Sequence, residues 1–141
     1  MRRLSMRNHQ REVKIDSPAL RWRMRWLLDV GLAWSEYEIG VHFISSRRMA
    51  KLNERHLLHK GATDILTFDY GGNLRSGELF ICPKVAAENA ERHRVSLGHE
   101  ISRYMAHGLL HMAGHDDKQA PDRQRMKRAE NKLLRRLTSD G

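Results

Sequence analysis

The feature that most constrains the fold is a helix that has to be buried on almost all sides. Ser96 is a suitable N-cap for a helix over about 97–113. Between Tyr104 and Ala113, apolar residues occupy nearly its whole circumference, and helices of this kind lie inside a domain. The rest of the chain must therefore surround this helix. One of its apolar stripes consists of Ile101, Met105, Leu109 and Met112.

The surrounding chain shows the periods of alternating strands and helices. Two-residue periods predict strands, helical periods predict helices, and Ser17 followed by Pro18 is a typical helix start. The resulting βαβαββααα order predicts an α+β fold, in which a small mixed four-stranded sheet packs against about five helices. The expected elements are a strand at 12–16, a helix at 18–32, a strand at 36–43, a helix at 47–57, strands at 63–70 and 78–83, and helices at 83–93, 97–113 and from 121 onward.

Length and composition limit the class of protein. No linker or repeat interrupts the pattern, so residues 1–141 are expected to form one domain, with a basic N-terminal arm at 1–11. Hydrophobic content of 40% and charged content of 30% fit a globular protein. No apolar run is long enough to span a bilayer, and the N-terminus lacks the apolar core of a secretory signal. With a single cysteine, Cys82, and hence no internal disulfide, we expect a cytoplasmic protein without a membrane partner.

The charge balance favours a polyanionic partner. The net charge is +9, and lysine and arginine side chains bind nucleic acids by neutralising phosphates. The same excess also fits a basic surface that is merely solvated. Basic residues gather in the N-terminal third and in the last helix: Arg2, Arg3, Arg7, Arg11, Arg21, Arg23, Arg25, Arg123, Arg125, Lys127, Arg128, Lys132, Arg135 and Arg136.

The buried helix carries a candidate metal site. His107 and His111 lie one turn apart on one face, where two imidazoles can bind a single ion, although this pair alone also fits core histidines. Gly114 favours the end of the helix, after which the chain can bring a third ligand to the metal. Ten residues after the first histidine that ligand is Asp117, with His115 as the alternative.

Three protein ligands are typical of a catalytic zinc site, because they leave one position open for water. Zinc lowers the pKa of that water, and the resulting hydroxide can attack either a peptide or a phosphodiester. A metallopeptidase of the zincin type has a glutamate after the first histidine, whereas this chain has Gly108. That difference and the positive charge favour the phosphodiester, with the peptidase as an alternative. No protein side chain is assigned as the general base.

Three motifs resemble those of the YbeY-type endoribonucleases, the bacterial rRNA maturation factors. HGLLHMAGHDD at 107–117 is similar to the family pattern HGxLHLxGYDH. LNERHLLHKGATDILTF at 52–68 partly matches LNxxYRxKDxPTDVLSF, and GELFICP at 77–83 matches GDIxIcp. All three occur in the order of the family, so the resemblance covers most of the chain beyond its N-terminal arm.

The resemblance implies a zinc-dependent endoribonuclease that prefers single strands, with one zinc ion per chain. Its partners would be RNA and the small ribosomal subunit. It would mature the 3′ end of the small-subunit rRNA in the cytoplasm and contribute to ribosome quality control. The cleaved bond and the oligomeric state are not indicated.

The sequence departs from the family pattern at two ligand-side positions. Asp117 replaces the usual histidine and His115 the usual tyrosine. A carboxylate also binds zinc, so the ligand set His107, His111 and Asp117 stays the prediction.

Two further departures concern substrate binding. Leu57 replaces the arginine of the family, and His59 stands at the following lysine position. His59, Arg55 and Arg103 are candidates for substrate contacts, and Arg103 has the alternative of pairing with Glu100 one turn away. Leu57 also keeps open a ribosome-assembly factor that does not cleave RNA and whose metal is structural.

Overall fold

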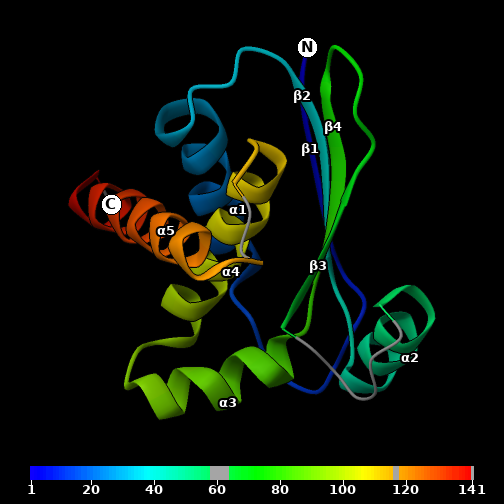
Figure 1. Ribbon diagram of the computed structural model, residues 1–141. Helices are drawn as coiled ribbons and strands as arrows, with labels where there is room; N and C mark the ends of the chain where they lie inside the picture. Colours follow the sequence, from blue (N-terminus) through cyan, green and yellow to red (C-terminus); the bar gives the residue numbers. More distant parts are fainter. Residues whose placement is uncertain (58–63, 116–117, 141) are drawn as a thin grey trace.

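The protein has the predicted order of strands and helices. The computed structural model describes residues 1–57, 64–115 and 118–140 (Figure 1). The α+β fold with a mixed four-stranded sheet is confirmed. The elements are β1 Arg2–Asn8, α1 Ser17–Trp26, a π-helical turn η1 Leu27–Gly31, β2 Tyr37–Phe43, α2 Ser46–Leu57, β3 Ile65–Asp69, β4 Arg75–Ile81, α3 Pro83–His93, α4 Leu97–Met112 and α5 Ala120–Asp140.

The sheet has the strand order β1-β2-β4-β3. β1, β2 and β4 are parallel, and β3 pairs antiparallel with β4. Helices α1, α4 and α5 cover one face of the sheet, and α2 lies on its other side (Figure 1). Alternate residues of β2 therefore point into the main core, and Tyr37, Ile39, Val41 and Phe43 are each at most 1% exposed.

Helix α4 is the centre of this core, as its composition predicts. Its residues Ile101, Met105 and Leu109 are fully buried, and it contacts α1, α3, α5, β3 and β4. Gly108 permits the close approach of α4 to the sheet. A Cβ atom at this position would lie 2.7 Å from Leu79 Cδ2 and 3.1 Å from Thr67 Oγ1.

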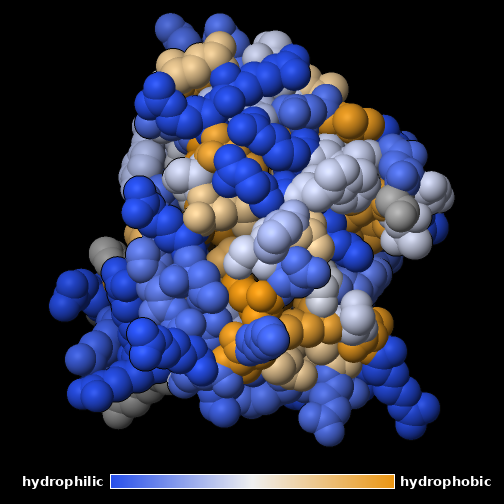
Figure 2. Space-filling view, turned by 180° about the vertical axis from the view of Figure 1, so that it is seen from behind, coloured by the Kyte–Doolittle hydropathy of each residue, from blue (hydrophilic) through white to orange (hydrophobic). Residues whose placement is uncertain are grey.

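The surface is dominated by polar and charged side chains. Figure 2 shows a mostly hydrophilic face, on which hydrophobic residues gather in limited patches. Within the described ranges, no helix combines the length and apolarity that a membrane crossing requires.

The N-terminal prediction was wrong about the position of the first strand. The strand comprises Arg2–Asn8, within the expected arm, rather than residues 12–16. Its residue Leu4 is buried against the core. The segment after it turns instead, because the buried amide of Gln10 accepts from Val13 N at 3.0 Å and donates to Val13 O at 2.8 Å. These bonds use backbone groups of Val13 that a strand would offer to its neighbour.

The first helix starts as predicted, but its cap is a different residue. The carboxylate of Asp16, not the hydroxyl of Ser17, accepts a hydrogen bond from Ala19 N at 3.1 Å. The α-helix changes to π-helical geometry after Trp26, and Leu32 N then donates to Leu27 O at 2.8 Å. The expected helix at 18–32 is therefore two segments of different pitch.

Substitution of Gly108 by alanine tests the close packing of α4 on the sheet. We expect Gly108→Ala to lower the free energy of unfolding by about 1 kcal/mol, because overpacking outweighs the better helix propensity of alanine. Gly98→Ala in the same helix is the control, since no atom lies within 4 Å of a Cβ there. Urea denaturation measures both variants, and equal stabilities would contradict the contact at Gly108.

The N-cap assignment is tested by a pair of adjacent substitutions. We expect Asp16→Ala to lower the free energy of unfolding by about 1 kcal/mol, because it removes the acceptor for the first turn of α1. Ser17→Ala should have a smaller effect, since the Ser17 hydroxyl does not cap the helix. Thermal and urea unfolding of the two variants give the comparison, and a larger loss for Ser17→Ala would reverse the assignment.

Candidate metal centre

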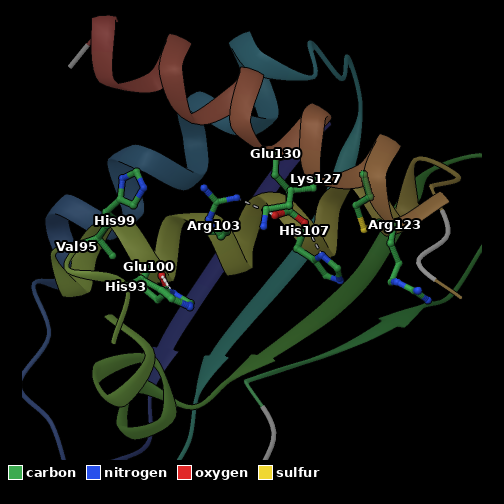
Figure 3. A pocket seen from close by; sticks show the side chains of 10 residues that line it. His93, Val95, His99, Glu100, Arg103, His107, Arg123, Lys127 and Glu130 are labelled. Atoms are coloured by element: carbon green, nitrogen blue, oxygen red, sulfur yellow. Dashed lines mark hydrogen bonds and ion pairs between the residues drawn. The ribbon is translucent and has the colours of Figure 1, made fainter. Parts of the chain in front are cut away.

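The first predicted ligand, His107, lies at a pocket between α4 and α5. The pocket has a volume of about 510 Å³, and residues of both helices and of the end of α3 line it. Figure 3 shows His107 and Arg103 on α4, next to Glu130 and Lys127 on α5. The His107 side chain is 29% exposed, so it is anchored in the protein but accessible from outside.

Glu130 fixes the orientation of His107. Its carboxylate oxygen Oε2 lies 2.6 Å from His107 Nδ1, and its Oε1 lies 3.1 Å from an Arg103 guanidinium nitrogen. The Glu130 side chain is only 9% exposed, so both contacts form in a partly dehydrated environment. One buried carboxylate thus connects the candidate ligand to a cation of the same helix.

This contact determines which imidazole nitrogen can face a metal. A carboxylate only accepts hydrogen bonds, so Nδ1–H of His107 is the donor and Nε2 is the nitrogen suited to a metal. Histidine ligands of zinc generally donate their second N–H to a carboxylate or carbonyl group in this way. The orientation of His107 is therefore the one that a histidine ligand needs, although residues 1–57, 64–115 and 118–140 bring no group of three candidate ligands together. The same contact also joins α4 to α5.

Helix α4 ends just before Gly114, as the sequence predicts. Gly114 has a φ of +105° and lies just after the helix, and a Cβ atom there would meet no other atom. The turn is closed by His115 N, which donates to Leu110 O at 3.0 Å. His111 is exposed in the last turn of α4, one turn after His107, and His115 is half-buried beyond Gly114.

The remaining predicted residues are placed only in part. Asp117, the predicted third ligand, and His59 lie outside the described residues, so both stay predictions. Arg55 is exposed on α2. The side chain of Leu57 is also outside the described part of the structure.

The pairing of Arg103 with Glu100, which the sequence analysis gives as an alternative to a substrate contact, does not form. Arg103 pairs with Glu130 of α5, not with Glu100 one turn away. Glu100 is 3% exposed at its side chain and lies 3.3 Å from His93 Nδ1. The helical spacing places Arg103 and Glu100 on one face, but the packing of α5 and α3 brings each a partner from another element.

Sequence reasoning missed Glu130, although α5 contains a signal for it. Met126, Leu133 and Leu137 form the buried stripe of this helix, and Glu130 falls within that stripe by its spacing. A carboxylate among core positions needs a hydrogen-bonding partner. The stripe therefore indicated a buried ionic contact, but not that its partner would be His107.

The charge state of His99, another residue that lines the pocket, differs from that of the neighbouring arginine and lysine side chains. Burial, together with the nearby Arg103 and Arg23, holds the pKa of His99 below its usual value. At neutral pH His99 is therefore an uncharged imidazole, and the permanent cations of this pocket are arginine and lysine side chains.

The structure provides no space for the glutamate of a zincin-type peptidase. That glutamate would stand at position 108, where a Cβ atom already meets Leu79 and Thr67 of the sheet. Position 108 thus faces the strands, whereas His107 faces α5. This geometry argues against the metallopeptidase.

The family model and the related sequences that match this chain share one family name. A family model described as Endoribonuclease YbeY matches residues 5–138. A protein named endoribonuclease YbeY from Bacteroides thetaiotaomicron is 35% identical over 125 residues, which cover 86% of this chain and 91% of that protein. One of the same name from Chlorobium luteolum is 38% identical over 102 residues, covering 71% and 74%.

The fold has a counterpart among solved structures. The solution structure of a protein from Thermotoga maritima matches with a TM-score of 0.68 at 20% identity, and the match covers 97% of this chain and 90% of that one. This likeness concerns the arrangement of strands and helices. Since the family model spans nearly the whole sequence and the relatives exceed 30% identity, the chain belongs to the endoribonuclease YbeY family.

Proposed function

We propose that this protein is a metal-dependent endoribonuclease that cuts single-stranded RNA. The names of its relatives support RNA cleavage. The proposal that a metal takes part rests on the contact of 2.6 Å between His107 Nδ1 and the buried carboxylate of Glu130. We further propose that zinc is held by His107, His111 and Asp117, with one ion per chain.

The residues of the chain have distinct tasks in this proposal. Zinc, when bound, would supply an acidified water and a Lewis acid for the phosphoryl oxygen. Glu130 orients the His107 ring and favours its binding through Nε2. Arg103 balances the charge of Glu130, so that the carboxylate is stable in its buried position.

The likeness to the family supports a proposal for the biological substrate. We propose that the protein acts in the cytoplasm on the 3′ end of small-subunit rRNA and takes part in ribosome quality control. The net charge of +9 is suited to a partner that is rich in phosphate.

One sequence feature favours a second candidate, a ribosome-assembly factor with a structural metal. Leu57 has no charge, whereas the family pattern has an arginine at this position. Such a factor would bind RNA without cutting it, so a cleavage assay distinguishes the two functions.

The metal and the activity are tested together on the purified protein. We expect zinc in wild-type protein at one ion per chain, and its loss in His107→Ala and Asp117→Ala, because each removes a ligand. His115→Ala and the distant His9→Ala should keep the metal.

Elemental analysis measures zinc, and an rRNA-like single-stranded oligonucleotide and casein serve as substrates. Cleavage of RNA alone, lost with the metal, supports the proposal, whereas RNA binding without cleavage supports the assembly factor.

The role of Glu130 is tested by a substitution that keeps its size. We expect Glu130→Gln to weaken zinc binding by about 10–100-fold, since partners of this kind orient metal-bound histidines. A chelator competition measures the affinity, and nitrogen NMR of the His107 ring reports its tautomer.

The matched control for Glu130 is Glu100→Gln, which alters another buried carboxylate at the same pocket. We expect this variant to bind zinc like wild type. Equal zinc affinities for Glu130→Gln and wild type, with an unchanged tautomer of His107, would show that Glu130 only joins the two helices.

A further inference from the structure

The pocket beside His107 contains two cations, Arg123 and Lys127, for which the described residues provide no ion-pairing carboxylate. Arg123 and Lys127 line it from α5, four residues apart and thus on one face of that helix. In the part of the chain that the structure describes, neither forms an ion pair. Arg123 donates to the backbone carbonyl of Lys118 at 2.9 Å, a contact that leaves its charge uncompensated.

The acidic groups of the pocket already have hydrogen-bonding partners. Glu130 binds Arg103 and His107, and Glu100 lies beside His93. Both carboxylates face these partners and not Arg123 or Lys127. Among the lining residues, Arg103, Arg123 and Lys127 outnumber the two carboxylates, a balance that favours an anion.

The shape of the site places this anion next to the candidate metal. α4 contributes Arg103 and His107 at a spacing of four, and α5 contributes Arg123 and Lys127 opposite them, so the pocket extends along both helices. Figure 3 shows Arg123 extending from α5 beside His107. An anion bound between the two helices would thus lie next to His107, the candidate metal ligand.

We propose that Arg123 and Lys127 form a subsite for a backbone phosphate of single-stranded RNA, adjacent to the phosphate that is cut. The identity of this ligand rests on the proposed function. The subsite would hold the strand beside His107 without reading its bases, because both cations contact phosphate alone.

Binding to a strand that stays intact tests the subsite separately from catalysis. The probe is a fluorescent 2′-O-methyl RNA oligonucleotide whose length is checked by gel electrophoresis after each titration, and its affinity is measured by anisotropy between 50 and 200 mM salt. We expect the double variant Arg123→Ala/Lys127→Ala to bind roughly tenfold more weakly at the lowest salt. The slope of log affinity against log salt should fall by about 0.7 for each phosphate contact that is lost.

A second double variant controls for general charge. Arg128→Ala/Lys132→Ala removes two exposed cations from the same helix, on the side turned away from the pocket. We expect a much smaller loss of affinity and little change in the salt slope. The swap Arg123→Lys/Lys127→Arg keeps both charges and should retain most of the affinity, and thermal unfolding verifies that all variants fold.

Several results would overturn the subsite: no binding by wild type, equal losses in the two alanine variants, an unchanged salt slope, or a swap variant as weak as the alanine variant. Cleavage of an unmodified strand is followed in parallel. If wild type does not cut RNA but the pocket variant alone loses binding, the subsite stands and the nuclease proposal fails. If wild type cuts RNA and both alanine variants bind it equally, the nuclease proposal stands and the subsite fails.

Discussion

The contact between His107 and Glu130 is the interaction on which the candidate metal centre depends. It joins the buried helix α4 to α5, selects one nitrogen of the imidazole for a metal, and holds the ring at the edge of an open pocket. The cost of burying the Glu130 carboxylate is offset by two hydrogen-bonding partners, Arg103 and His107. A single ionic contact thus serves both the packing of two helices and the geometry of a candidate ligand.

The same helix can serve both purposes only because its two sides differ. Gly108 faces the sheet and allows the helix to lie against Leu79, whereas its neighbour His107 faces α5. A larger side chain at 108 would displace the helix from the sheet and so disturb the contact between the ring and Glu130. The packing of the core and the position of the ligand are therefore coupled through two adjacent residues.

The fold was largely predictable from the sequence, whereas the site was predictable only in its local part. The apolar circumference of α4 and the glycine after it are local signals, and both predictions hold. The first strand was misplaced, because alternation alone could not show that the Gln10 amide closes a turn. The partners of Arg103 and His107 depend on how α5 packs, and no spacing within α4 contains that information.

The placement of Glu130 has a consequence for the newly made chain. His107 is held by a residue that is 23 positions further along, on α5. During synthesis the strands and α4 emerge first, so the core can begin to assemble while the imidazole still lacks its anchor. The His107 ring therefore acquires its fixed orientation only when α5 docks, after translation has passed the codons of that helix.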